Sequence, residues 1–415
     1  MKSKHCPRWI AVLAIVMAGC AARRYPAPPL RYSEELVEIE GRPSATGAAP
    51  AASDADGRWP APKNALVLSG GGMCGAYTAG VLKGWTESGT RPRFDVVTGI
   101  STGALIASFA FLGPEYDAEL ERLYTSMRRE DVYRPRLWFD SVASSEPLER
   151  RIAAGATPEI LHKIAEAHRQ GRRLFVGTTN LDTKRLVVWD LGAIAARDSP
   201  ESGILFQNVL LASCSVPGLL PPVPIDVEID GKRFTELHVD GGVTASVLLR
   251  PEMVGIRPNG MLSSEADHIS VSVIVSGKLC PDAVPAKREL FSISGESMTA
   301  VLQAKLEGDL TRLFLLARYA KADFNLTGVR QDYVAGSNSM SFDPQVMRTL
   351  FDEGFRGGRD GTAWQSTPPG LEMERFAPPR SNTRFATVPG ASSPGSWTPE
   401  KIRITLDGDN SVNAR

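Results

Sequence analysis

The stretch Asp95-Val-Val-Thr-Gly-Ile-Ser-Thr-Gly-Ala-Leu-Ile-Ala-Ser-Phe-Ala-Phe-Leu112 decides how the rest of the chain is interpreted. It begins with a short apolar run typical of a buried strand, Val96 to Ile100, and ends with a helix-compatible run, Ala104 to Leu112. Between them, Gly99-Ile100-Ser101-Thr102-Gly103 is a G-x-S-x-G, in which a sharp strand-to-helix turn presents the serine oxygen at the end of the strand. We interpret Ser101 as a candidate nucleophile; a glycine-rich turn without chemistry is the alternative.

The composition limits the class of protein. The chain has 415 residues, is 42% hydrophobic and carries 47 basic against 47 acidic side chains. This length fits one large α/β domain with disordered ends. A net charge of zero argues against a nucleic-acid-binding protein, whose binding surface is basic. The five cysteines show no C-x-x-C pair, so neither a zinc site nor a disulfide framework is expected; they are Cys6, Cys20, Cys74, Cys214 and Cys280.

The N-terminus has the features of a targeting segment. Three basic residues precede or border an apolar run, Trp9 to Ala18, that is too short to span a bilayer. The run ends in Met17-Ala18-Gly19-Cys20, which resembles the lipobox of bacterial lipoproteins. That resemblance implies cleavage before Cys20 and lipidation of this residue. An ordinary secretory peptide, cut near Ala18 or Ala22, is the alternative.

These features predict how the N-terminal part of the chain is organised. Residues 1–20 are expected to be a lipoprotein-type signal peptide. Residues 21–62 are rich in Ala, Pro, Gly and Ser and are expected to form a disordered linker. The protein is then expected in the bacterial cell envelope, on the outer-membrane or periplasmic side, held to the membrane by lipid on Cys20.

A second glycine-rich turn opens the ordered domain. Ser69-Gly70-Gly71-Gly72-Met73-Cys74-Gly75 lies between a predicted strand, Ala65 to Leu68, and a predicted helix, Ala76 to Ser88. Gly70, Gly72 and Gly75 form a G-x-G-x-x-G, but the next strand lacks the acidic residue that a dinucleotide site needs. No G-K-[ST] follows, so a P-loop is excluded. Backbone N–H groups of such a loop can instead hold the oxyanion of acyl transfer.

The two turns together resemble the patatin-like phospholipases, which pair a glycine-rich oxyanion loop with a G-x-S-x-G on the next strand–helix turn. Three further stretches are similar to segments of that family: Thr178-Thr179-Asn180-Leu181-Asp182, Ala212-Ser213-Cys214-Ser215-Val216-Pro217 and Asp240-Gly241-Gly242. The similarity runs from Asn64 to Gly242 and extends to about residue 360. Cys74 stands where the family often has Arg or Lys, so any electrostatic help from a cation there is absent.

The resemblance implies a fold, an activity and a set of site residues. The fold is a three-layer α/β/α arrangement with a mostly parallel central sheet, in a domain of residues 63–360 followed by a poorly ordered tail, residues 361–415. The activity is hydrolysis of phospholipid or other lipid esters, with no metal or organic cofactor. Ser101 is the implied nucleophile and Asp240 the implied base. The oxyanion hole is formed by Gly70, Gly71 and Gly72, and the other motif positions are Gly75, Gly99, Gly103, Gly241 and Gly242.

Two questions stay open from the residues alone. A predicted strand, Arg233 to Val239, is followed by Asp240, so His238 and Asp240 share a face if the strand runs on regularly. A Ser–His–Asp triad, as in a carboxylesterase, could use His238 or His268, whereas the resemblance implies a Ser–Asp dyad; we favour the dyad, because a carboxylate in a partly apolar site is basic enough. An envelope scaffold with weak or lost activity is the alternative to an enzyme, and Cys74 points that way.

Two further helices are predicted in the rest of the sequence. Pro158 to Gln170, with Thr157 as its N-cap, is expected to carry His162 and His168 on a solvated surface. Ser297 to Lys321 is expected to be a long amphipathic helix, with five leucines near one face: Leu302, Leu306, Leu310, Leu313 and Leu316.

Overall fold

The structure is a computed structural model, and it describes residues 38–39, 62–136, 140–229, 232–256, 269–282, 285, 287–333 and 339–371. All of them belong to one compact unit, Met1–Glu372. The predicted signal peptide with Cys20, the residue His268 and residues 372–415 lie outside the described residues.

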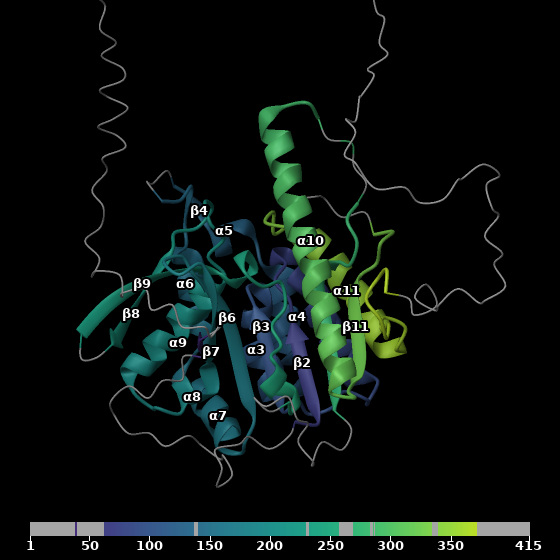
Figure 1. Ribbon diagram of the computed structural model, residues 1–415, viewed down its shortest axis with the longest axis horizontal. Helices are drawn as coiled ribbons and strands as arrows, with labels where there is room; N and C mark the ends of the chain where they lie inside the picture. Colours follow the sequence, from purple (N-terminus) through teal and green to yellow (C-terminus); the bar gives the residue numbers. More distant parts are fainter. Residues whose placement is uncertain are drawn as a thin grey trace, which may run out of the picture. The chain divides into compact units, whose positions relative to one another are not determined.

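A mixed, mostly parallel sheet lies at the centre of the described residues (Figure 1). Its strand order is β1-β7-β6-β3-β2-β10-β11, and β9 pairs with β6 and with β8. β6, β3, β2, β10 and β11 are mutually parallel, whereas β7 and β9 run antiparallel to β6. The strands of this sheet are β1 (Glu38–Ile39), β2 (Asn64–Leu68), β3 (Val96–Ile100), β6 (Arg173–Asn180), β7 (Arg185–Asp190), β8 (Val223–Ile229), β9 (Lys232–Asp240), β10 (Ser270–Lys278) and β11 (Asp323–Val329).

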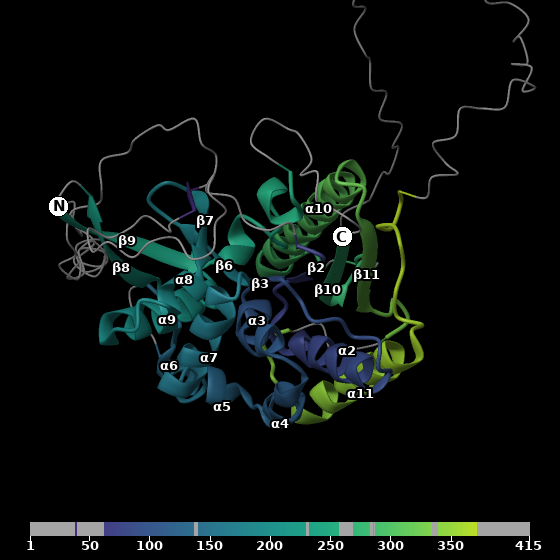
Figure 2. The same ribbon diagram turned by 90° about the horizontal axis from the view of Figure 1, so that it is seen from below.

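Helices cover both faces of the sheet, as the two views show (Figures 1 and 2). One face is covered by a thick layer: α2 (Gly75–Glu87), α3 (Thr102–Leu112), α4 (Asp117–Ser126), α6 (Glu146–Gly155), α7 (Pro158–Arg169), α8 (Leu191–Ala195), α9 (Pro200–Ser213) and α11 (Pro344–Asp360). The other face is covered by α10 (Leu290–Tyr319) and by residues 245–256, which include the short helix η4 (Pro251–Val254). The predicted three-layer α/β/α fold is confirmed.

Smaller elements join these layers. They are η1 (Gly72–Cys74), η2 (Pro114–Tyr116), α5 (Arg129–Val132), η3 (Gly241–Val243) and a separate two-stranded sheet of β4 (Arg134–Pro135) and β5 (Ala143–Ser144). η1 and η3 are the ones that bear on the site: η1 lies within the glycine-rich turn after β2, and η3 directly follows Asp240 at the end of β9.

The central strands owe their position to an apolar sequence buried on both faces. All five residues of β3 are buried, and β2 is buried from Ala65 to Leu68. Such near-continuous apolar strands are typical of parallel sheets with helices on both sides. Because β2 and β3 are buried, the positions of the two turns that follow them are fixed. These turns are the two glycine-rich motifs.

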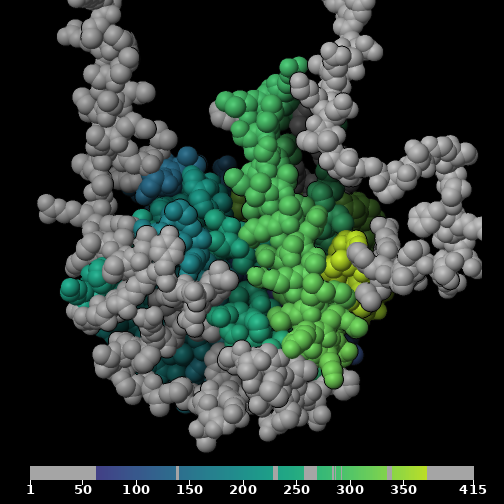
Figure 3. All heavy atoms as spheres, in the orientation of Figure 1, coloured from purple at the N-terminus to yellow at the C-terminus, as the bar shows by residue number. Residues whose placement is uncertain are grey.

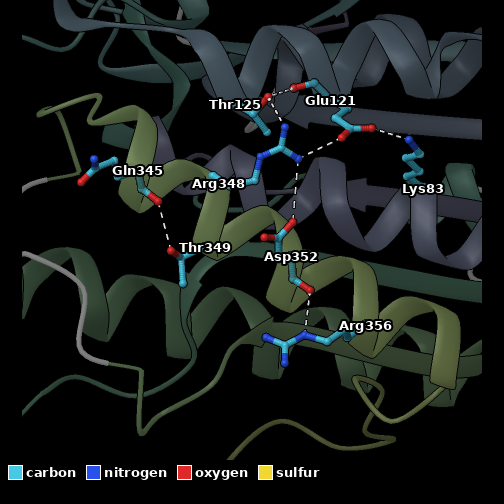
Figure 4. Close-up of polar contacts among 8 residues, drawn as sticks. All are labelled: Lys83, Glu121, Thr125, Gln345, Arg348, Thr349, Asp352 and Arg356. Carbon is cyan, nitrogen blue, oxygen red and sulfur yellow. Dashed lines mark hydrogen bonds and ion pairs between the residues drawn. The ribbon is translucent and has the colours of Figure 1, made fainter.

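α2, which begins directly after the glycine loop, is held in place by α11. The two backbones touch: a Cβ on Gly80 would lie 2.1 Å from the Phe351 carbonyl oxygen, and a Cβ on Gly354 would lie 2.2 Å from that of Tyr77. Figure 4 shows the polar contacts beside this interface, where Arg348 of α11 donates to Glu121 of α4 at 2.9 Å. Lys83 of α2 contacts the same carboxylate. Exposed ion pairs add little stability, so the close helix contact is what anchors α2.

α7 differs from the prediction in one respect. The helix and its cap are as expected, since the Thr157 hydroxyl accepts from the Ile160 N–H at 3.3 Å, and His162 is exposed. His168, however, is buried, and the prediction of a solvated surface was wrong for it. The last turn of α7 packs on α8, where a Cβ on Gly192 would lie 2.6 Å from His168 Nδ1. The missing side chain of Gly192 is what makes room for the ring.

α10 also differs from the prediction. It begins at Leu290, seven residues before the expected start, and ends at Tyr319. Leu310 and Leu313 are buried against the sheet as expected, but Leu302 is exposed. The predicted apolar face is therefore real only in the C-terminal half of the helix.

Two short segments outside the predicted domain also pair with the sheet. Glu38–Ile39, inside the stretch expected to be a linker, pairs in parallel with β7. Gln365, in the stretch expected to be a tail, exchanges two backbone hydrogen bonds with Leu326 of β11, each of 2.8 Å.

Candidate active site

Ser101 stands at a strained turn between β3 and α3. Its φ of 54° and ψ of −127° belong to a region that residues with a side chain rarely occupy. Two hydrogen bonds hold it there: its N–H donates to Ser213 Oγ at 2.9 Å, and its carbonyl accepts from the Ala104 N–H at 2.8 Å. A strained residue held by its surroundings is a pointer to function, and the sequence pattern had located it.

The two glycine-rich turns are packed against each other. A Cβ on Gly103 would lie 2.5 Å from the Ser69 carbonyl oxygen, and a Cβ on Gly70 would lie 3.0 Å from Ser101 Cβ. Larger residues at either position would push the turns apart. The glycine loop therefore lies directly beside the Ser101 side chain.

Some backbone N–H groups of the glycine loop have a hydrogen-bond acceptor, and others do not. The N–H of Met73 donates to the Ser339 carbonyl at 2.8 Å, and that of Cys74 donates to the Gly71 carbonyl at 3.1 Å. Within the described part of the chain, no protein acceptor takes the N–H groups of Gly70, Gly71 or Gly72. Donors of this kind beside a nucleophile are suited to stabilising a developing oxyanion.

Asp240 lies at the end of β9, opposite Thr178 of β6. Its carboxylate accepts from the Gly242 N–H at 2.6 Å. Burial raises the pKa of Asp240 from 3.8 to about 6, and the neighbouring Ser101 side chain and the Gly242 N–H oppose that rise. The carboxylate is thus ionised at neutral pH, yet more basic than an exposed one.

The C-terminal end of α9 positions both Ser101 and Asp240. Ser213, the last residue of α9, accepts from the Ser101 N–H and donates through its hydroxyl to the Gly177 carbonyl at 2.8 Å. Two residues later, the Ser215 carbonyl accepts from the Asp240 N–H at 2.9 Å. The sequence had identified this A-S-x-S-x-P block only as a family segment. The sequence signal for these supporting roles was the pair Ser213 and Ser215, which flank one residue at the end of a predicted helix.

His238 is not directed at Ser101. It is fully buried, with Nδ1 2.9 Å from Thr178 Oγ1 and Nε2 3.0 Å from Glu236 Oε2. Because the Glu236 carboxylate can only accept, Nε2–H donates to it, and in the neutral ring Nδ1 accepts from the Thr178 hydroxyl, which itself accepts from Trp189 Nε1. Both ring nitrogens are therefore engaged away from the serine. The other candidate histidine, His268, lies outside the described residues.

Two further side chains bear on the site. Burial raises the pKa of the Cys74 thiol to about 11, so at neutral pH it supplies no charge to the glycine loop. Lys305 of α10 acts on the other side: its ammonium lies 3.6 Å from Asp309 Oδ2, and its charge lowers the pKa of Asp240. The sequence reasoning missed Lys305, because a lysine in a long helix carries no signal of what it faces.

The strained serine at a strand–helix turn, the glycine loop beside it and the buried carboxylate form an arrangement suited to nucleophilic acyl transfer. Residues 66–252 match the family model described as patatin-like phospholipase. The family suggested by the sequence motifs is confirmed. In the described residues, no helix is both long and apolar enough to cross a membrane.

Individual proteins are similar to the chain over parts of their length. A cUMP-AMP-activated phospholipase of Escherichia coli is 30% identical over 221 residues, which cover 51% of this chain and 63% of that protein. Among solved structures, VipD from Legionella pneumophila aligns with a TM-score of 0.34 and 13% identity, covering 85% of this chain and 73% of that one. The type III effector ExoU aligns with a TM-score of 0.28 and 13% identity, covering 73% and 54%.

Proposed function

We propose that the chain is a serine acyl hydrolase that cleaves ester bonds of phospholipids or other lipids through a Ser101–Asp240 dyad. The observation that carries this proposal is a strained Ser101 next to a buried carboxylate whose pKa is raised to about 6 and is influenced by the Ser101 side chain. A serine needs a neighbouring base to become a nucleophile, and Asp240 is the base in contact with it.

The steps follow from the geometry. Ser101 Oγ attacks the ester carbonyl while Asp240 takes its proton, and the N–H groups of Gly70, Gly71 and Gly72 stabilise the resulting oxyanion. Asp240 then gives the proton to the departing alcohol, leaving an acyl group on Ser101. In the second half, Asp240 takes a proton from water, the hydroxide releases the fatty acid, and the proton returns to Ser101.

The test is to remove the nucleophile. Ser101→Ala should lower kcat/KM on phospholipid vesicles and on a soluble short-chain ester by about 10⁴-fold or more, and should abolish labelling by a fluorophosphonate. Ser126→Ala is a suitable control, because Ser126 is an exposed helical serine of α4. Labelling and turnover that persist in a folded Ser101→Ala protein would contradict the assignment. Absence of both from the unaltered chain would favour the scaffold alternative.

We further propose that the protein is held in the bacterial envelope by lipid on Cys20. Support comes from the sequence, where an apolar run ends in Met17-Ala18-Gly19-Cys20. Cys20→Ser should release the protein from the membrane fraction and abolish incorporation of labelled fatty acid, because it removes the thiol that the lipobox-like sequence marks for lipidation. Continued labelling together with continued sedimentation with membranes would show the anchor to be wrong.

A further inference from the structure

The N-terminal half of α10 exposes large apolar side chains at several positions. Leu290, Ile293, Met298, Val301 and Leu302, here called the apolar tip, are each between 46% and 75% exposed. Glu296 is the one charged residue between positions 290 and 304. Single exposed apolar residues need no explanation, but a cluster of this kind marks a surface that contacts something else.

The apolar tip lies beyond the strand ends that carry the candidate active site. α10 follows β10 and precedes β11, so it runs antiparallel to these strands, with its N-terminal half at their C-terminal ends. Its C-terminal half packs on the sheet through Leu310, Leu313 and Phe314. Figures 1 and 3 show the N-terminal half of α10 standing out beyond the sheet.

Three contacts fix the level at which the helix passes the site. Lys305 Nζ donates to Ser246 Oγ at 3.4 Å and lies close enough to act on Asp240. Two residues earlier, Gln303 Nε2 donates at 2.9 Å to the carbonyl of Leu279, the residue that follows β10. Residues before Gln303 therefore extend past the level of Asp240, and the span from Leu290 to Leu302 adds about 20 Å at 1.5 Å per residue.

The charges beside the apolar tip suit a phospholipid surface. Lys287 and Arg288 are exposed just before the helix, and the exposed Glu289 lies between them and Leu290. Basic side chains next to an exposed apolar helix segment are a combination that binds anionic headgroups and the acyl region beneath them.

We propose that the apolar tip of α10 inserts into the headgroup–acyl boundary of a phospholipid bilayer and thereby brings the edge of the sheet with Ser101 and Asp240 against the membrane. The proposal rests on the proposed function in one respect only: placing the site against the membrane is useful if the chain hydrolyses lipids there. Membrane insertion itself is independent of turnover and can be measured without it.

The experiment compares two sets of substitutions in the full chain carrying Cys20→Ser and Ser101→Ala, so that neither an attached lipid nor hydrolysis contributes. One set is Ile293→Gln, Met298→Gln and Val301→Gln. The matched control is Ile204→Gln with Leu315→Gln, because these residues are also exposed on helices, each at 59%, but lie off the tip. Glutamine is a good helix former, so both sets keep the helices intact.

The readout is co-sedimentation with vesicles of phosphatidylcholine alone or mixed with phosphatidylglycerol. The tip set should lower the vesicle partition coefficient by about tenfold or more, the control set should leave it within about twofold, and the mixed vesicles should bind more protein. Circular dichroism checks helix content. Equal binding by the tip set and the control set would overturn the proposal.

Two more measurements separate the remaining outcomes. With Ser101 restored, the ratio of activity on vesicles to activity on a soluble short-chain ester should fall by about tenfold in the tip set. If the chain is inactive on both substrates but the tip set still loses vesicle binding, the proposed function fails while the insertion stands. If the tip set instead changes a dimer into a monomer in sedimentation velocity without affecting vesicle binding, the tip is an interface between copies of the chain, and the proposal is wrong.

Discussion

Asp240 and Asp190 are alike in most properties that are used to find catalytic acids and bases. Both are buried, and burial raises the pKa of each to about 6. Both cap a short helix, since Asp240 accepts from the Gly242 N–H at 2.6 Å and Asp190 from the Ala193 N–H at 2.8 Å. A raised pKa alone would not distinguish them.

The difference between them is what each carboxylate faces. Asp240 faces the strained Ser101, and both the Ser101 side chain and the charge of Lys305 lower its pKa. Asp190 lies 3.6 Å from His168, whose pKa is lowered to about 4 by burial and by nearby arginines, so the ring is neutral at neutral pH. The neighbouring nucleophile, rather than the perturbed pKa, therefore makes Asp240 a candidate base and leaves Asp190 a structural cap.

Matched substitutions test this comparison most strongly. Asp240→Asn should lower kcat/KM on a soluble short-chain ester by about 10³-fold or more, because the proton acceptor is lost. Asp190→Asn should stay within about threefold, because it contacts no reacting group. Comparable losses in the two variants, with both folded, would mean that the contact with Ser101 is not what matters.

Asp240→Asn should also make the protein more stable at pH 8. The pKa of Asp240 is raised above its unfolded value of 3.8, so the stability that protonation gives is complete below pH 3.8 and is lost as pH rises through about 6. A neutral amide avoids the cost of the buried charge and can still accept from Gly242, so the free energy of unfolding should rise by about 1 to 3 kcal/mol. Denaturant unfolding at pH 8 measures it; a loss of stability would show that the charge is better compensated than its surroundings suggest.

The pH dependence of activity gives a smaller but more specific effect. Asp240 must be ionised to accept a proton, so kcat/KM should be level above pH 7 and fall about tenfold for each unit below pH 6. The measurement is kcat/KM between pH 4.5 and 8.5 for the unaltered chain and for Asp190→Asn. The same profile is expected in both, and a midpoint that moves in Asp190→Asn would tie that carboxylate to catalysis after all.

The smallest effect on activity is expected at His238. His238→Ala should leave kcat/KM of the folded protein within about fivefold, because neither ring nitrogen faces Ser101. It should lower the free energy of unfolding by about 2 to 4 kcal/mol, since it removes two buried hydrogen bonds and strands the Glu236 carboxylate. Adding Glu236→Gln should recover part of that loss. A folded His238→Ala protein as inactive as Ser101→Ala would replace the dyad by a triad.

Much of the site was predictable because its motifs are local. A G-x-S-x-G between an apolar run and a helix specifies the turn at Ser101 within a few residues, and the glycine loop is encoded in the same way. The predicted strands β2 and β3 and the cap of α7 are confirmed for the same reason, since near neighbours in the chain decide them. The resemblance of five ordered motifs then gave the fold.

The remaining parts depend on contacts between residues far apart in the chain. The sequence could place His238 and Asp240 on one strand, but only packing shows that Thr178 and Glu236 hold the histidine while Ser101 meets the carboxylate. His168 was expected in solvent because charges surround it in sequence, and it is buried because Gly192 leaves room for its ring. Neighbours in space cannot be inferred from neighbours in sequence.

The sequence by itself determined the class of fold, the position of the serine turn and the family, because each depends on short patterns of apolar residues and glycines. Tertiary structure alone decided the pKa of Asp240, the supporting roles of Ser213 and Ser215, the position of Lys305 and the exposure of the N-terminal half of α10. The physical reason is that burial, electric field and solvent exposure are properties of the surroundings that distant segments create together, and no single segment of the chain carries them.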